Sequence, residues 1–146
     1  MKTNISDPLR SLIYTEFKPV DVVFDSMFDP SRMTRGEYIR YYFIDSNEVA
    51  KHSDGETREY ILEIVYYFDT KRDRFKKAFD DVYSDRIEHL KQLLDENRSY
   101  NDGTYRWHEI TVELEPLTTV EELEDIEEEQ TIAQRFVVTI IRSNFR

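Results

Sequence analysis

The stretch "TREYILEIVYYFDT", residues 57–70, decides the fold. Alternate residues form an unbroken apolar face, made of Tyr60, Leu62, Ile64, Tyr66 and Phe68. The residues between them, Ile61, Glu63, Val65 and Tyr67, are only half polar. A strand with one face in water alternates cleanly between apolar and polar side chains. We therefore expect something to cover the second face as well as the first.

The composition indicates one folded domain over residues 1–146. The chain is 39% hydrophobic, with ten Tyr and nine Phe, which excludes a disordered composition. It has no apolar run long enough for a membrane span, and its first residues lack a signal-peptide core. The absence of Cys excludes disulfides and thiolate metal sites. The net charge of −11 argues against general binding to nucleic acid or anionic membranes.

The charge is concentrated in one stretch. Residues 109–129 hold ten acids and no Lys or Arg, whereas "KRDRFKK", residues 71–77, is strongly basic. Both segments can be solvated surface. Alternatively, they create an electrostatic field that attracts a partner or a neighbouring copy of the chain, or that repels a polyanion.

The apolar periodicity predicts an α+β fold with a mostly antiparallel sheet. One long amphipathic helix, residues 73–97, packs on a face of the sheet, and a short N-terminal helix starts at Pro8. This short helix could cover part of the second face. Strands are expected at residues 20–24, 37–44, 57–70, 106–115 and 131–145, with an acidic connection at 117–130.

A hairpin turn at Asp54-Gly55 sets the expected pairing of two strands. It places four residues of the first strand opposite four of the second: Tyr41 opposite Phe68, Tyr42 opposite Tyr67, Phe43 opposite Tyr66 and Ile44 opposite Val65. The polar tip, residues 46–58, is expected to be a mobile loop. In the strand at 106–115, the alternation places Trp107 on the wet face, as an anchor at the strand start.

The sequence contains no motif that predicts catalysis. His52, His89 and His108 are scattered and lack metal-ligand spacing. Three Gly exclude a phosphate-binding loop or a dinucleotide fingerprint, and no nucleophile elbow or calcium loop is present. We therefore expect no enzyme, no catalytic residue, no metal and no cofactor.

The second face predicts self-association instead. Tyr42, Ile44, Val65, Tyr67, Val137 and Ile141 would form a broad apolar surface there. The basic and acidic segments could meet head to tail and close a ring. The subunit-interface residues are then predicted to be Tyr42, Tyr67, Lys71, Arg72, Arg74 and Lys77. The acidic residues facing a lumen or a partner are predicted to be Glu121, Glu122, Glu124, Glu127 and Glu128.

The strand "TREYILEIVYYF", the helix-like "FKKAFDDVYSDRIEHLKQLL", a Trp-bearing strand and the final "TIAQRFVVTIIRS" resemble tail terminator (tail-completion) proteins of tailed bacteriophages. The resemblance covers roughly residues 37–143. It implies a virion protein, made in the host cytoplasm, that forms a homo-oligomeric ring, typically a hexamer. The ring would cap the tail tube protein and join it to a neck (connector) protein, while DNA passes without specific binding. The acidic segment would face either the lumen or a basic partner.

Three alternatives remain open at this point. The chain could be another head–tail connector or neck protein, since its first forty residues and its long acidic connection fit a terminator less clearly. It could be an acidic DNA-mimic inhibitor, although its acids are concentrated rather than distributed. It could also be a small enzyme that uses carboxylates or His89.

Overall fold

A computed structural model describes residues 3–18, 20–25, 27, 36–69, 84–101, 103, 106–115 and 131–145. It contains two helices, α1 (Thr3–Phe17) and α2 (Ser84–Glu96). The long strands are β2 (Glu37–His52), β3 (Gly55–Asp69) and β7 (Thr131–Phe145). The shorter strands are β1 (Asp21–Phe24), β4 (Tyr100–Asn101), β5 (Arg106–Trp107) and β6 (Glu109–Glu115).

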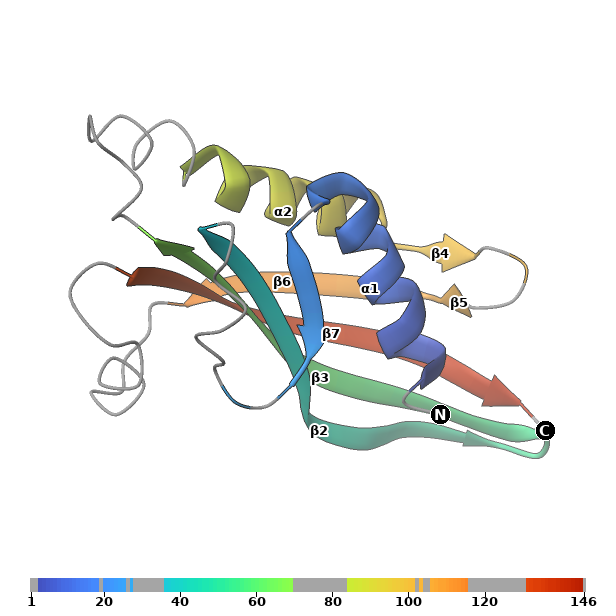
Figure 1. Cartoon of the computed structure of the whole chain (residues 1–146). Coiled ribbons are helices and arrows are strands. Elements are labelled where there is room, and N and C mark those ends of the chain that lie inside the picture. Colours follow the sequence, from blue (N-terminus) through green and yellow to red (C-terminus); the bar gives the residue numbers. More distant parts are fainter. Residues whose placement is uncertain are drawn as a thin grey trace.

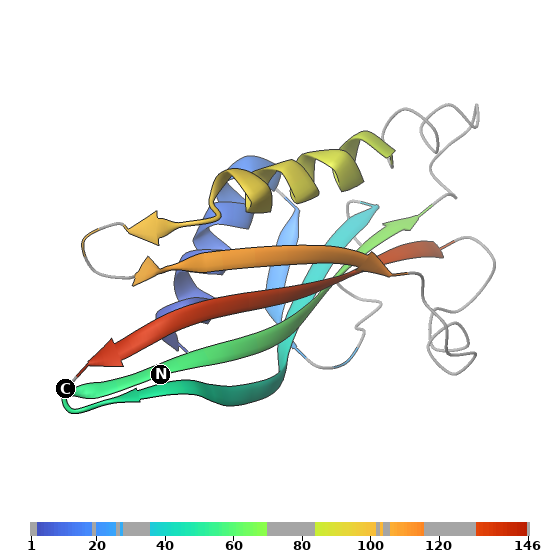
Figure 2. The ribbon, with the colours of Figure 1, turned by 180° about the vertical axis from the view of Figure 1, so that it is seen from behind.

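Five strands form one twisted sheet in the order β1-β2-β3-β7-β6. Every pairing in it is antiparallel except that of β1 with β2, and β4 and β5 form a separate two-stranded ribbon. Both helices lie on the same face of the sheet (Figures 1 and 2). The chain is therefore α+β overall with a mostly antiparallel sheet, but strands dominate the described residues and the predicted fold with one long helix on the sheet is wrong.

The core lies between the helices and this face. Helix α1 contributes a stripe with a spacing of four residues, and α2 contributes three leucines: Ile5, Leu9, Ile13, Phe17, Leu90, Leu93 and Leu94. They pack on the alternating apolar residues of β3 and β7, including Leu62, Ile64 and Phe136. Full burial of each such side chain stabilises the fold by about 1.5–3 kcal/mol. The apolar face expected from the quoted stretch is thus the floor of the core.

The prediction of a single long helix is wrong. Helix α2 has thirteen residues, and α1, expected to be the shorter, has fifteen. The apolar periodicity runs on upstream of α2, but a start signal interrupts it, because Ser84 and Asp85 are residue types preferred at a helix N-terminus. The remainder of the predicted range, residues 73–83, lies outside the described residues.

Helix α1 also differs from its expected position. It begins at Thr3, so Pro8 lies inside it rather than at its first position. The missing N–H of Pro8 costs one hydrogen bond, and the extra turn buries Ile5 completely. Because α1 packs on the same face as α2, it does not cover the second face of the sheet.

The predicted register between β2 and β3 is wrong by four positions. Tyr38, not Tyr42, lies opposite Tyr67, and Phe43 lies opposite Leu62. The turn is formed by Ser53 and Asp54, one residue earlier than expected, which accounts for half of the shift. Two irregularities, between Phe43 and Asp45 and between Glu48 and Ala50, each add one residue to β2 and account for the rest.

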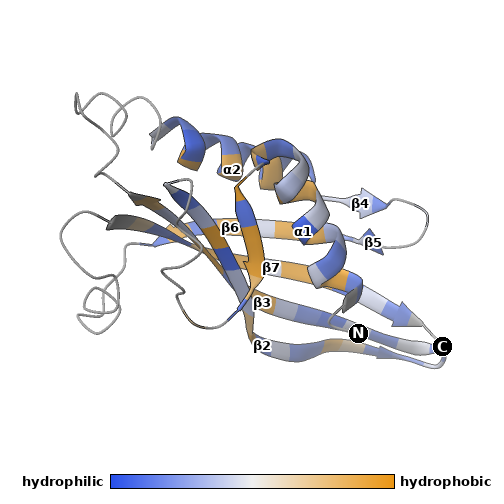
Figure 3. Cartoon of the chain, in the orientation of Figure 1, coloured by the Kyte–Doolittle hydropathy of each residue, from blue (hydrophilic) through white to orange (hydrophobic). Residues whose placement is uncertain are grey.

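The ladder also continues to the hairpin tip, so the expected loop at 46–58 is paired strand. Residues 45–59, together with residues 141–145 of β7, form a projecting three-stranded arm. From Asp45 to His52 the arm extends about 24 Å at most. Hydrophobic residues gather beneath the helices, whereas the arm is mostly hydrophilic (Figure 3).

The expected strand at 106–115 is broken at His108, between β5 and β6. The break turns Trp107 into the interior, where it is 2% exposed, so its predicted place on the wet face is wrong. The Trp107 indole Nε1 donates to the Asn97 carbonyl at 2.9 Å, and the ring stacks on Tyr100 at 4.4 Å. Trp107 thereby fixes the end of α2 to the sheet.

We expect Ile5→Ala to lower the free energy of unfolding by about 2–5 kcal/mol, because it leaves a cavity in the core. A helix that started at Pro8 would leave this position outside the fold, and the change would then cost almost nothing. Urea unfolding followed by circular dichroism measures the difference. Ser11→Ala, on the exposed side of α1, is the matched control.

Candidate assembly surface

The helix-free face of the sheet carries a second, smaller cluster of buried side chains. Tyr38, Val65 and Tyr67 are each at most 2% exposed. The Tyr38 and Tyr67 rings stack at 5.5 Å across the β2–β3 pair. In the quoted stretch, Val65 and Tyr67 on the half-polar face are therefore buried by contacts within the chain.

A buried arginine lies in the middle of this cluster. The Arg40 guanidinium donates two hydrogen bonds to the Tyr67 hydroxyl, at 3.0 and 2.7 Å. It also lies over the Tyr42 ring at 5.0 Å. Such contacts replace part of the hydration that the cation loses on burial.

A buried carboxylate balances the charge one row further along. Glu63 forms an ion pair with Arg135 of β7 and accepts a hydrogen bond from the Tyr42 hydroxyl. Burial raises the pKa of Tyr42 to about 12, and the hydrogen bond to Glu63 and its negative charge act in the same direction, against Arg40. The middle of this face is therefore a network of aromatic rings and charges.

We expect Glu63→Gln to destabilise the fold by about 3–5 kcal/mol, because it leaves Arg135 buried without its counter-charge. Combining it with Arg135→Met removes both charges and should recover most of that loss. A double-mutant cycle measured by urea unfolding gives the coupling between the two residues. Additive single effects would show that the two charges do not stabilise each other.

Stability should fall as the pH rises from about 10 toward 12. The folded state holds the Tyr42 proton to a higher pH than the unfolded chain, since the pKa of Tyr42 is raised to about 12. The contribution is therefore complete below pH 10 and lost as the pH passes the folded value. Tyr42→Phe should flatten part of this decline in denaturant melts. Tyr41, whose pKa burial also raises to about 12, accounts for a further part.

Exposed apolar side chains gather at one edge of the sheet. Phe24 is the last residue of β1 and Met27 follows the strand, while Ile44 and Val49 are the residues skipped at the β2 irregularities. All four are between 50% and 71% exposed. Strand β1 pairs with β2 at residues 38–41, which leaves the edge of β2 from Phe43 onward without a neighbouring strand in the described chain. We call these four residues and this edge the apolar edge.

Aromatic rings connect the apolar edge to the core. The Phe24 ring contacts Tyr41 at 5.4 Å and Phe43 at 5.9 Å, and Phe43 contacts Tyr60 at 6.1 Å. Phe24 is therefore the exposed end of a rigid aromatic series. Exposed apolar residues on a rigid support are typical of contact surfaces between proteins.

The structure describes two of the predicted interface residues. Tyr67 is buried in its own chain, and Tyr42 is half-buried against Glu63. Lys71, Arg72, Arg74 and Lys77, and the acidic group from Glu121 to Glu128, lie outside the described residues. Strand alternation already placed Ile44 on the predicted apolar surface, but it could not reveal Val49, which is exposed at an irregularity inside the tip that was expected to be a loop. For Phe24, the sequence gives only a weak indication of exposure, its position at the end of a short strand and before the loop-like "DSMFDP".

No group of three or more potential metal ligands is found among the residues that the structure describes. His52 and His108 instead belong to a hydrogen-bonded series across the arm. The series runs from His52 Nε2 to Thr57 Oγ1 (2.9 Å), from there to Ser143 Oγ (2.8 Å), and on to His108 Nε2 (2.8 Å). It ties the hairpin tip to the first residue before β6. In the same part of the chain, neither helix is long and apolar enough to cross a membrane.

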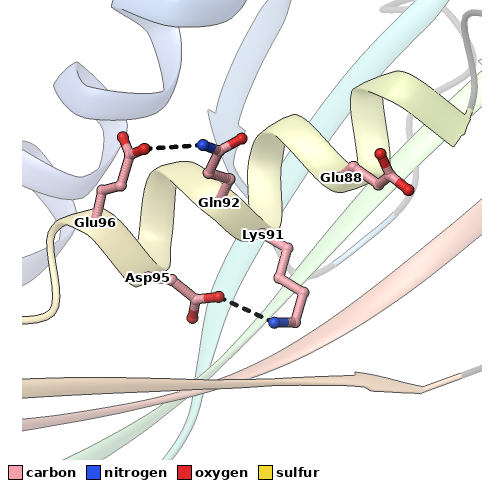
Figure 4. A pocket seen from close by; sticks show the side chains of 5 residues that line it. All are labelled: Glu88, Lys91, Gln92, Asp95 and Glu96. Atoms are coloured by element: carbon pink, nitrogen blue, oxygen red, sulfur yellow. Dashed lines mark hydrogen bonds and ion pairs between the residues drawn. The ribbon is translucent and has the colours of Figure 1, made fainter.

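A shallow depression of about 390 Å³ lies along the exposed side of α2 (Figure 4). Its described lining is polar: Glu88, Lys91, Gln92, Asp95 and Glu96. Lys91 donates to Asp95 at 2.9 Å, and Gln92 donates to Glu96 at 3.0 Å. These pairs at i,i+4 are ordinary for a solvated helix face.

Comparison with known proteins gives a match at the level of fold. No family model matches the sequence, and no curated protein does. Among solved structures, the sheath/tube terminator of the PVC extracellular contractile injection system aligns with a TM-score of 0.55 and 11% identity. The tube-terminating cap of the anti-feeding prophage (AFP) aligns with a TM-score of 0.50 and 13% identity.

The chain shares the fold of these terminator proteins. The first alignment covers 100% of this chain and the second covers 97%. They cover 57% and 55% of the two larger proteins, so the chain spans little more than half of their length. The predicted resemblance to tail terminators is confirmed at this level, that of the fold.

Proposed function

We propose that this protein is a structural tail terminator, which assembles into a ring at the end of a tail tube. The observation that carries the proposal is the fold shared with two tube terminators over essentially the whole chain. The apolar edge supports it, because exposed apolar residues at a sheet edge suit contact with another protein.

The layout of the sheet supports a head-to-tail ring. Strand β6 and the uncovered part of β2 are different edges of one sheet, and within the described residues neither has a strand on its outer side. A contact between two different surfaces repeats from one copy to the next, and the copies form a closed ring when the rotation between neighbours allows it. We propose a hexamer, which would bind the last ring of tube protein, block further polymerisation and present a new surface to a neck protein.

The proposed role requires no catalytic step and no cofactor. It places the protein in the virion, or in a related injection particle, after synthesis in the host cytoplasm. DNA would pass without specific binding, since a chain with a net charge of −11 repels phosphate. The two similar proteins are longer than this chain, and the chain aligns with only 57% and 55% of them. Contacts of this chain with a tube protein and a neck protein are therefore proposed.

The test is the mass in solution by light scattering over a range of concentrations, with and without tube protein, together with negative-stain images. Rings formed by the protein alone or on added tubes would support the proposal. A monomer that ignores both tube and neck proteins would refute it.

The variant Ile44→Ser with Val49→Ser tests the apolar edge. Both side chains are more than half exposed, so we expect little change in melting temperature and about a tenfold or greater weakening of self-association. Tyr14→Ser is the control, since Tyr14 is an exposed aromatic residue on α1. Equal effects of the two changes would show that the apolar edge is not a contact surface.

A further inference from the structure

Arg142 stands out among the charged residues of the arm because two of the three nitrogens of its guanidinium are buried without a hydrogen-bond partner. Its Nε and Nη1 atoms are inaccessible to solvent and have no hydrogen-bond partner. Burial lowers the pKa of Arg142 most strongly, Tyr60 opposes this effect, and the nearby Arg106 adds to it. A desolvated cation of this kind is costly unless an anion accompanies it.

The neighbouring arginine on β3, in contrast to Arg142, has both a hydrogen-bond partner and an ion-pair partner. Arg58 lies directly opposite Arg142 in the β3–β7 pair. It donates to the Ser46 side chain at 3.0 Å and forms an ion pair with Glu56 at 3.3 Å. Glu56 is thus engaged by Arg58, and Arg142 keeps an unused capacity for a carboxylate.

Strand β6, at the edge of the sheet, carries carboxylates that lack a cationic partner in the described part of the chain. Glu113 and Glu115 are exposed on β6 and form no ion pair in the described part of the chain. They pair in register with Val137 and Arg135 of β7. Arg142 lies about 17 and 24 Å further along that strand. A glutamate side chain cannot span this distance, so the two groups cannot meet within one copy.

We propose that Arg142 is a carboxylate-binding site, which Glu113 or Glu115 of a second copy completes in the ring. The inference rests on the proposed function, because it requires a head-to-tail contact. A second copy is the favoured source, since each chain carries an excess of acids and would repel DNA phosphates. Arg142 then repays its desolvation cost only in the assembled state.

The first experiment is a charge swap with two variants. Arg142→Glu alone and Glu113→Arg/Glu115→Arg alone should each place like charges in the contact and weaken self-association by at least about tenfold. A mixture of the two should restore rings, because an alternating arrangement pairs every acid with a base. Failure of the mixture to restore assembly, or normal assembly of Arg142→Glu, would overturn the inference while leaving the ring itself intact.

The second experiment covers the case in which Arg142→Glu does not fold. Arg142→Gln should weaken assembly yet leave the melting temperature of the monomer unchanged or higher, because it removes an unpartnered charge. Arg98→Gln is the control, since Arg98 is exposed and paired with Glu109, and it should change neither property. Equal losses of stability and assembly in Arg142→Gln would point to a packing role and overturn the proposal.

If the wild-type protein forms no ring, the proposed function fails, and the site is tested on the monomer. A hexaglutamate peptide should then raise the melting temperature of the wild type but not that of Arg142→Gln. No shift in the wild type would overturn the carboxylate site. Binding of a labelled DNA duplex that depends on Arg142 would also overturn it, in favour of phosphate.

Discussion

The structure depends on strand β3, which is enclosed from all sides. It pairs along its whole length with both β2 and β7. Its Leu62 and Ile64 form the floor of the core, while Val65 and Tyr67 belong to the buried cluster on the other face. No other arrangement satisfies its apolar side chains and its backbone groups together, because a strand at an edge or with a wet face would leave one set exposed. The positions of the helices and of the neighbouring strands follow from this requirement.

Much of this could be predicted from the sequence, because local periodicity reports which faces are covered. Strands β3 and β7 and the floor of the core follow directly from it. The register of the hairpin does not, since two inserted residues in β2 leave no mark on its polar tip. The extent of α2 was also missed, because a start signal at Ser84 competes with an apolar pattern that continues upstream. Trp107 was misplaced for the same kind of reason, a backbone break at His108 that alternation cannot reveal.

The candidate surface shows the same limit more strongly. Tyr42 and Tyr67 were selected by parity, yet the charges around them make that region part of the interior. Arg40 and Glu63 are charged, yet tyrosines and Arg135 enclose them. Of the exposed apolar residues of β2, Ile44 belongs to the predicted surface, whereas Val49 emerges only from the three-dimensional pairing. The alternation of side chains therefore predicts that the second face is covered. It does not distinguish residues that are buried within the chain from residues that stay exposed for a partner.

The same features restrict how copies of the chain can associate. Pairing of β6 with another β6 would bring Glu109, Glu113 and Glu115 against their own kind, which is repulsive. Pairing of β2 with another β2 would join two irregular edges, whose local twist and unpaired residues disfavour a regular ladder. Contacts between like edges are thus disfavoured, and a contact between unlike surfaces remains. Such a contact has a direction and can close into a ring, which is the property that a protein needs if it is to end a tube rather than extend it.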